Sequence, residues 1–133
     1  MTSYPKEYLD LFKEKTRAFA YLATTMPDGS PQVTPVWFST EGDFILINSV
    51  KGRVKDRNMR ARPQVALLIA DPHNPYRYLQ VRGRVVEITE DGAEEHIHAL
   101  SRKYTGNPRF NIRPGDVRVI YKIKPDKTFP YNW

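Results

Sequence analysis

The residues best suited to bind a charged ligand lie in one short segment, KGRVKDRNMRARP, at positions 51–63. Six of its thirteen side chains are cationic, and Asp56 is its only acid. Gly52 allows a tight turn into a helix, and the first N–H groups of a helix have no partner within it, so they suit a phosphate. Arg53 and Lys55 can close around such a group, one with a fork of donors and the other with a mobile point charge. The segment therefore predicts an anion-binding helix start.

Two other interpretations of this segment stay open on residue types alone. The first is a solvated basic helix with scattered ion pairs, and the second is a non-catalytic module that binds nucleic acid or stores a cofactor. The aromatic residues do not interleave with the cations as they do in single-strand binding proteins, and no helix-turn-helix, zinc-finger or RNP pattern is present. On a helical projection, Val54, Asn58 and Ala61 fall together, and we expect this seam to pack against the rest of the fold.

Composition restricts the class of protein. The chain has 133 residues, which fits a single domain over 1–133, and its formal net charge of +6 favours an anionic partner. It has no cysteine, which excludes disulfides and thiol catalysis and fits a cytoplasmic location. No apolar run approaches the roughly 20 residues of a membrane span, and the first residues lack the apolar centre of a signal peptide, so we expect no membrane association.

Hydrophobic patterning predicts a mainly β fold with short helices. Asp28-Gly29 is a strong hairpin signal, and Gly83 indicates a bulge or sharp bend within a long strand. Because hairpin turns dominate and no βαβ repeat is present, we expect a six-stranded antiparallel barrel, which removes the sheet edges. Such a barrel has little room inside, so a ligand should lie outside it or between two copies. Helices are expected at 5–17, 53–62 and 91–106, and strands at 18–25, 31–40, 44–49, 64–71, 76–89 and 117–125.

Three stretches in order carry a resemblance to a known family: TPVWFSTEGDFILINS (34–49), GRVKDRNMRARPQVALLIAD (52–71) and YRYLQVRGRVVEI (76–88). Together they resemble the split-barrel flavin/deazaflavin oxidoreductases, the superfamily related to pyridoxamine 5′-phosphate oxidase. The Lys-x-Arg-Asn core of 55–58 is the most specific part, and the details are similar to the subgroup that uses the deazaflavin coenzyme F420. The resemblance implies a homodimer of six-stranded split barrels of the FMN-binding type, with two cofactor sites at the interface.

The same resemblance implies which residues hold the cofactor, in three groups. The strand that borders the isoalloxazine or deazaflavin ring is matched by Thr34, Pro35, Val36 and Trp37. Positions near the phosphate and the ribityl chain are matched by Asn48 and Ser49, and those around the phosphate by Arg53 and Lys55, with Arg57 and Asn58 nearby. The residues expected to approach from the partner subunit are Tyr78 and Gln80.

The activity implied by the resemblance is an oxidoreductase that binds F420 and transfers hydride to or from a small conjugated or unsaturated organic substrate. The alternative is an FMN-binding flavoprotein of the pyridoxamine-phosphate-oxidase-like type. The classical oxidase carries adjacent Arg and Lys in its phosphate motif, whereas Val54 precedes Lys55 here, which argues against pyridoxamine phosphate as the substrate. The six cations of 51–63 exceed the need of one phosphate and favour F420, which has an anionic oligoglutamate tail. No catalytic acid or base is implied.

The HIH sequence at 96–98 is the one pattern that invites a metal-site interpretation. Residues i and i+2 of a helix point about 200° apart, so His96 and His98 cannot easily share one ion. His73 stands alone in an expected turn, and the chain has no cysteine to serve as a ligand. The sequence therefore predicts no metal site.

Overall fold

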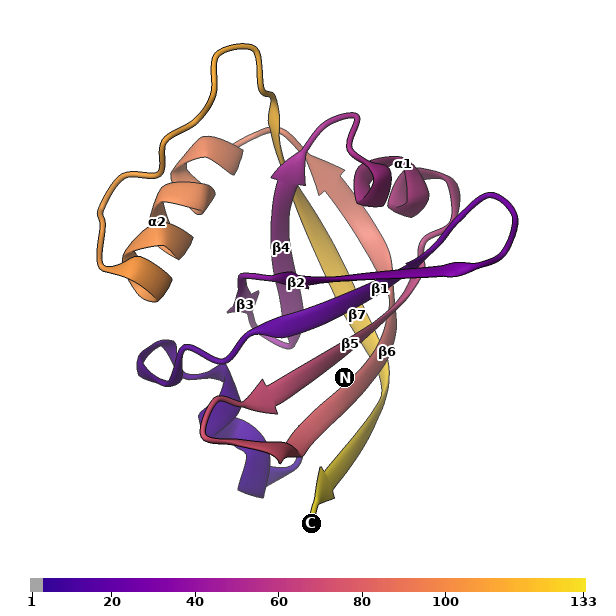
Figure 1. Ribbon diagram of the computed structural model, residues 1–133, viewed down its shortest axis with the longest axis vertical. Helices are drawn as coiled ribbons and strands as arrows, with labels where there is room; N and C mark the ends of the chain where they lie inside the picture. The colour runs from indigo at the N-terminus through magenta and orange to yellow at the C-terminus, as the bar shows by residue number, and fades with distance from the viewer. Residues whose placement is uncertain (1–3) are drawn as a thin grey trace.

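The apolar runs of the sequence form seven antiparallel strands in the computed structural model, which describes residues 4–133 (Figure 1). Along the sheet the strand order is β2-β1-β5-β6-β7-β4-β3. The mainly β, antiparallel architecture predicted from the sequence is confirmed. The strands are β1 (Ala20–Thr25), β2 (Pro31–Val36), β3 (Phe38–Glu41), β4 (Phe44–Val50), β5 (Gln64–Asp71), β6 (Asn74–Thr89) and β7 (Arg118–Asn132).

The predicted number of six strands was wrong because the expected strand 31–40 divides at Trp37. Its first half, β2, pairs with β1, whereas its second half, β3, pairs with β4 at the other edge of the sheet. A single residue therefore links the two edge strands, and the sheet curls so that these edges meet at Trp37 (Figure 1). The result is a half-barrel with Trp37 at its seam.

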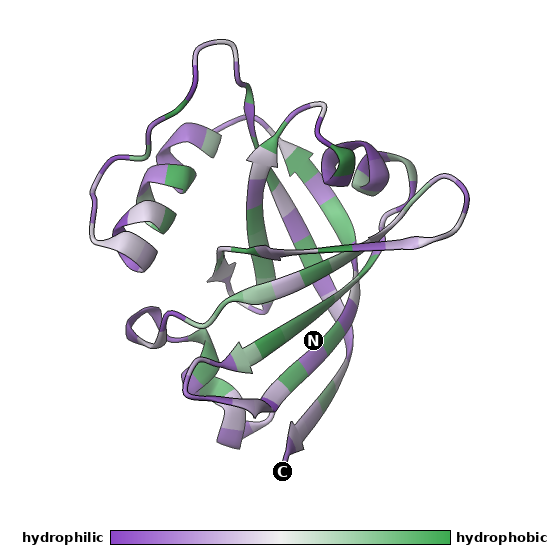
Figure 2. Cartoon of the chain, viewed as in Figure 1, coloured by the Kyte–Doolittle hydropathy of each residue, from purple (hydrophilic) through white to green (hydrophobic). Residues whose placement is uncertain are grey.

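Buried apolar side chains alternate with exposed ones along the strands, so they gather on the inner face of the curled sheet. In β1, Ala20 and Leu22 are buried whereas Tyr21 is exposed. Figure 2 shows the same alternation as green and purple bands along β6 and β7. Phe38 and Tyr121 are among the largest fully buried side chains. This core fixes which face each strand turns outward, and hence where polar side chains can gather.

The helices of residues 4–133 lie outside the sheet (Figure 1). They are the 3-10 helices η1 (Lys6–Phe12) and η2 (Glu14–Thr16) and the α-helices α1 (Val54–Ala61) and α2 (Ala93–Thr105). The expected helix 5–17 is therefore two 3-10 helices. In η1, Tyr8 and the fully buried Leu11 are three residues apart, which aligns them on one face of a helix with three residues per turn. α2 ends at Gly106 in the left-handed conformation, within a residue of the expected end.

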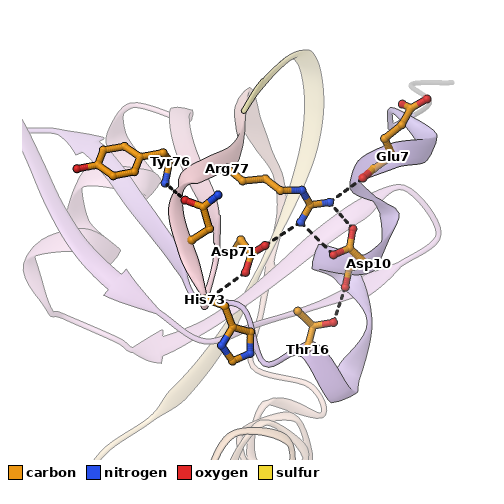
Figure 3. Close-up of polar contacts among 8 residues, drawn as sticks. Glu7, Asp10, Thr16, Asp71, His73, Tyr76 and Arg77 are labelled. Carbon is orange, nitrogen blue, oxygen red and sulfur yellow. Dashed lines mark hydrogen bonds and ion pairs between the residues drawn. The ribbon is translucent and has the colours of Figure 1, made fainter. Parts of the chain in front are cut away.

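Arg77 of β6 fastens η1 to the sheet (Figure 3). Its guanidinium donates hydrogen bonds to the carboxylates of Asp10, at 2.7 and 3.1 Å, and Asp71, at 3.0 Å, and to the carbonyl oxygen of Glu7 at 2.7 Å. It also lies 4.9 Å from the centre of the Tyr8 ring. The hydrogen bond from Arg77 holds the pKa of Asp10 below its ordinary value. One side chain therefore holds η1 and the end of β5 against β6.

Strand β7 extends beyond the strand predicted at 117–125 and includes most of the tail. Residues 120–123 pair with both β4 and β6, whereas the later residues pair with β6 alone within the described part of the chain. Pro125 and Pro130 lie in that one-sided part, where the missing N–H of a proline does not interrupt a second ladder.

The bend predicted at Gly83 is confirmed. The register between β6 and β7 shifts between Arg82 and Gly83. A Cβ atom at Gly83 would lie 2.3 Å from the carbonyl oxygen of Lys124, which only a change of backbone could relieve. Glycine therefore permits the close approach of two backbones at the point where the sheet turns.

Candidate functional site

A cavity of about 480 Å³ lies outside the sheet, against both α-helices. Its wall comes from six parts of the chain: the residue before β1, the β2–β3 junction, the end of β4, the start of α1, α2, and the segment that runs from α2 to β7. Ile97 and Leu100 supply its apolar surface on α2. The volume falls in the range of small-molecule sites, about 300–1,000 Å³.

The start of α1 forms a cationic part of this wall. Gly52, with a φ of +95°, turns the chain from β4 into the helix in a conformation that favours glycine. No side chain caps the helix N-terminus, so its first N–H groups are left for water or a ligand. Arg53 and Lys55 line the cavity beside them, and neither side chain has a hydrogen-bond or ion-pair partner among residues 4–133.

Asp56 fixes the geometry of this turn. Its carboxylate is 1% exposed and accepts hydrogen bonds from the N–H of Gly52 at 2.8 Å, from Nε of Arg60 at 2.9 Å, and from the hydroxyl of Tyr121. Burial alone would raise the pKa of Asp56, but these donors hold it below its ordinary value. The charged carboxylate therefore ties the helix start to the preceding turn and to β7.

The face of α1 that packs on the sheet differs from the predicted seam. Asn58 and Met59 are buried, whereas Val54 and Ala61 are exposed. Nδ2 of Asn58 donates a hydrogen bond to Oγ1 of Thr24 at 3.0 Å. Hydrogen bonds such as that from Asn58 to Thr24 therefore help to decide which face of α1 packs on the sheet. A helical projection of apolar residues does not show such hydrogen bonds.

Arg118, at the start of β7, adds a buried cation to the cavity wall. Only 7% of it is exposed, its Nε donates a hydrogen bond of 2.8 Å to Oδ1 of Asn48, and its guanidinium carbon lies 5.2 Å from the centre of the Phe110 ring. Burial, followed by the charge of Arg53, lowers the pKa of Arg118, and the same two causes lower the pKa of Lys55. An anion would relieve this concentration of positive charge.

A chain of hydrogen bonds orients Arg118 through Asn48 and His96. Nδ2 of Asn48 donates to the carbonyl oxygen of Ala93 at 2.9 Å and to Nδ1 of His96 at 3.1 Å. Nε2 of His96 lies 2.8 Å from Oγ of Ser39. Because Nδ1 accepts, His96 is neutral and carries its proton on Nε2. Burial, together with the charge of Arg118, lowers the pKa of His96 to about 4.

Aromatic rings form another part of the wall. The rings of Trp37 and Tyr104 are stacked with centres 5.3 Å apart, and Phe19 also stacks on Tyr104 at 5.3 Å. The Tyr104 hydroxyl donates to the carbonyl oxygen of Ala18 at 2.6 Å, and burial raises its pKa to about 12. Phe110 meets Trp37 edge to face at 6.0 Å. Phe19, Trp37 and Phe110 line the cavity, so it offers a planar ligand an aromatic surface.

The structure brings together seven of the twelve residues that the resemblance predicts: Pro35, Val36, Trp37, Asn48, Ser49, Arg53 and Lys55 all line the cavity. Oγ of Ser49 is buried and has no hydrogen-bond partner among the described residues. Thr34 precedes this wall in β2, opposite Leu22, and its Oγ1 is also buried without a partner among residues 4–133. The contact of these residues with a cofactor stays a prediction.

The other four predicted residues lie outside the wall of the cavity. Arg57 is on the exposed side of α1, and Asn58 is turned toward β1. Tyr78 and Gln80 are in β6, where Tyr78 stacks on Tyr131 with ring centres 5.5 Å apart. These two residues therefore belong to a different face of the same chain.

Sequence reasoning missed Arg118, Phe110 and two charged residues of the segment before β7, Arg113 and Asp116, which also line the cavity. Arg118 carried a signal, since it is a cation between two valines at the start of an expected strand. Phe110 is an isolated aromatic residue in a polar loop, which by itself indicates nothing. With Arg53 and Lys55, the lining residues include four cations and one carboxylate, so the cavity favours a ligand with a planar ring and an anionic group.

His96 and His98 have separate partners, because Nδ1 of His98 accepts a hydrogen bond of 2.9 Å from the N–H of Phe110. Within the described part of the chain, no three histidine, aspartate or glutamate side chains are grouped so that they could hold a metal ion.

No helix of residues 4–133 is both long enough and apolar enough to span a membrane.

Comparison with known families gives a match over nearly the whole chain. Residues 5–131 match the family described as Pyridoxamine 5'-phosphate oxidase. No curated protein matches the sequence.

Solved structures share the fold. An F420 reductase superposes with a TM-score of 0.82 and 36% sequence identity, over 95% of this chain and 98% of that one. A conserved hypothetical protein from Mycobacterium tuberculosis gives a TM-score of 0.73 at 23% identity, over 98% and 86% of the two chains. HupZ from Group A Streptococcus gives a TM-score of 0.69 at 17% sequence identity, over 98% of this chain and 99% of that one. The last two similarities concern the fold alone.

Proposed function

Because the chain belongs to the pyridoxamine 5'-phosphate oxidase family, we propose that it is an oxidoreductase that binds coenzyme F420 and transfers hydride to or from a small conjugated or unsaturated organic substrate. The similarity to an F420 reductase, at 36% identity over 95% of the chain, supports this choice of cofactor. The more distant relatives do not distinguish between cofactors.

The observation that carries the proposal is that one cavity combines an aromatic surface with a cationic helix start. Trp37 lines it at the seam of the half-barrel, and Arg53 and Lys55 line it at the start of α1. A deazaflavin coenzyme has a flat ring joined by a flexible chain to a phosphodiester. Such a ligand needs both kinds of surface within reach of each other.

The polar groups of the cavity fit the anionic part of this coenzyme. The buried Oγ of Ser49 lacks a partner among the described residues, and an oxygen of a ribityl phosphate would satisfy it. The first N–H groups of α1, with Arg53 and Lys55, would hold the phosphodiester. Pro35 and Val36 would border the ring through their backbone.

When bound, reduced F420 supplies a hydride from C5 of its ring to an electron-poor carbon of the substrate. The residues of the chain bind, orient and shield the reactants, and this positioning is the protein's main contribution to the rate. Trp37 and Phe110 exclude water from the aromatic side of the cavity. The hydroxyl of Tyr104 is committed to the carbonyl oxygen of Ala18, so we assign no proton donor.

The proposal includes a homodimer with two cofactor sites. Tyr78 and Gln80 lie outside the cavity of their own chain, so they reach a cofactor only from a second copy. Three aromatic side chains of β6 and β7 are each at least 43% exposed: Tyr76, Phe129 and Tyr131. Exposed aromatic side chains of this kind favour burial in a contact between two subunits. Light scattering should give the mass of a dimer, and a monomer at working concentration would contradict this part of the proposal.

One observation favours FMN as a second candidate cofactor. Of the six cations in 51–63, Arg60 is paired with Asp56, and Arg62 donates to the carbonyl oxygen of Thr25 at 2.7 Å. Arg57 donates to a backbone carbonyl oxygen, and Lys51 pairs with a glutamate. Four of the six cations therefore already have partners within the chain, which leaves fewer for the long anionic tail of F420 than the sequence suggests. FMN has a single phosphate and needs fewer cations.

A binding titration with F420, FMN and FAD, followed by fluorescence, tests the proposal. We expect F420 to bind more tightly than either flavin. Lys55→Ala should weaken the binding of F420 about tenfold or more, because it removes a charge-assisted contact to the phosphodiester. Lys124→Ala is the matched control, since Lys124 is exposed in β7 and does not line the cavity.

The outcomes separate the candidates. If the folded protein binds none of the three cofactors at high concentration, the proposal is wrong. A yellow protein that retains FMN through purification would replace F420 by FMN. Equal effects of the two lysine substitutions would show that Lys55 does not contact the ligand.

A further inference from the structure

We propose that Arg118 binds the phosphoryl group of the coenzyme together with Arg53 and Lys55, and that Asn48 and Phe110 hold it in position for that contact. The inference rests on the proposed function, because the phosphoryl group belongs to the proposed coenzyme. It extends that function by assigning an anion-binding role to the start of β7, far along the chain from the basic segment.

Arg118 places a buried positive charge in the cavity wall. The residue is 7% exposed and forms no ion pair with any carboxylate among residues 4–133. Asp116 acts on it only as a more distant charge. Its Nε bonds to Asn48, whereas its two Nη groups donate to no acceptor among the same residues. A buried cation without an anionic partner is costly, so a fork of donors held in the cavity wall indicates an anion that binds there.

The register between β4 and β7 brings Arg118 to the end of β4, just before the basic segment. Arg118 pairs with Val50, and the N–H of Lys51 donates to the carbonyl oxygen of Val117 at 2.9 Å. Backbone contacts therefore hold the start of β7 against the turn that carries Arg53. Arg118 lines the same cavity as Arg53 and feels its charge, so an anion bound by the start of α1 would share that cavity with the guanidinium of Arg118.

Hydrogen bonds and ring packing hold Arg118 in one orientation. The amide nitrogen of Asn48 is committed to Ala93 and His96, so its oxygen must face Nε of Arg118. The ring of Phe110 lies 5.2 Å from the guanidinium carbon. A fixed fork loses little conformational entropy on binding, which suits a site made for one group.

A second unsatisfied donor lies on the neighbouring strand. Ser49 pairs with Val119, the residue after Arg118, and its buried Oγ has no partner among residues 4–133. Both Ser49 and Arg118 line the same cavity. A phosphoryl group has enough oxygens to accept from both.

The experiment compares two ligands that differ in the phosphoryl group: F420, and the ribityl deazaflavin that lacks the phosphodiester. Arg118→Met should weaken the binding of F420 about tenfold or more and change the binding of the unphosphorylated compound less than about twofold. Arg118→Lys, which keeps the charge and loses the fork, should give an intermediate loss. Lys124→Met, an exposed cation of the same strand, should leave both affinities unchanged.

Equal losses for both ligands would make Arg118 a structural residue and overturn the inference, as would an unchanged affinity for F420. Wild-type protein that binds neither compound would refute the proposed function, and the anion site is then decided separately. For this purpose the Nε–H signal of Arg118 is followed by NMR during a titration of the wild-type chain with inorganic pyrophosphate. A saturable shift supports the site, and an unmoved signal overturns it even if the variants do not fold.

Discussion

Oδ1 of Asn48 accepts a hydrogen bond of 2.8 Å from Nε of Arg118, and this contact joins the end of β4 to the start of β7 inside the cavity wall. Asn48 is 9% exposed, and its amide nitrogen is committed to Ala93 and His96. A neutral amide whose donors and acceptor are all used thus sets the orientation of a buried cation.

Asn48→Ala should lower the free energy of unfolding by about 2–4 kcal/mol, because it removes the hydrogen-bond partner of the buried Nε of Arg118 and of Nδ1 of His96. Urea denaturation followed by circular dichroism measures the change. Asn107→Ala, in the exposed loop after α2, is the control and should cost less than about 1 kcal/mol. Equal losses in the two variants would show that the buried contacts of Asn48 add nothing.

His96 should make stability depend on pH. The unfolded chain takes up a proton at His96 near pH 6.5, whereas the folded chain does so only near pH 4. Between these values the unfolded state binds more protons, so the contribution is complete above pH 6.5 and is lost as the pH falls toward 4. The free energy of unfolding can fall by about 3 kcal/mol across this range of pH.

Unfolding measured above and below that pH window in wild-type protein and in His96→Gln tests this expectation. The variant should lack the part of the slope that His96 contributes. His73→Gln is the control, because His73 is exposed in the turn between β5 and β6 and should leave the slope unchanged. A wild-type slope that persists in His96→Gln would assign the acid sensitivity to other groups.

The strands were predictable wherever a local pattern decides them. The run 64–71 reads as a buried strand and forms β5 at the same residues. The division at Trp37 was not predictable, because it arises from the chain passing from one sheet edge to the other. The end of β7 was missed for a related reason. Its polar residues and Pro130 suit a strand that pairs on one side only, and the local sequence does not reveal which strands pair.

The site was predictable where its residues are neighbours in the sequence. Arg53 and Lys55 share one motif and line one cavity. Arg118 comes from a distant strand, and only the β4–β7 register brings it to them. The helical projection placed Asn58 correctly on the packed side of α1 but was wrong for Val54 and Ala61, which are exposed.

Gly83→Ala should destabilise the fold strongly, because its Cβ would lie 2.3 Å from the carbonyl oxygen of Lys124, a backbone atom that cannot rotate away. We expect the free energy of unfolding to fall by about 1–3 kcal/mol or more, the range measured for overpacked cores. Thermal unfolding measures it, with Arg84→Ala as the control, an exposed neighbour in the same strand expected within about 0.5 kcal/mol of wild type. Similar melting temperatures for Gly83→Ala and wild type would mean that the β6–β7 contact can open.

Tyr121→Phe should weaken the start of α1. It removes the hydroxyl hydrogen bond to the buried carboxylate of Asp56, which keeps its contacts with Gly52 and Arg60. Hydrogen bonds to charged groups contribute about 1.5–3 kcal/mol, and we expect a loss of that size in urea denaturation at neutral pH.

The acid dependence of this loss identifies its cause. Because the folded pKa of Asp56 lies below its ordinary value of 3.8, its contribution is present above that pH and is lost as the pH falls through the folded pKa. Tyr121→Phe raises that pKa, so the difference from wild type should shrink in acid. Tyr104→Phe is the matched control, since the Tyr104 hydroxyl donates to the neutral carbonyl of Ala18 and its loss should not depend on pH in this range. If both tyrosine variants respond to acid alike, the carboxylate of Asp56 is not what Tyr121 stabilises.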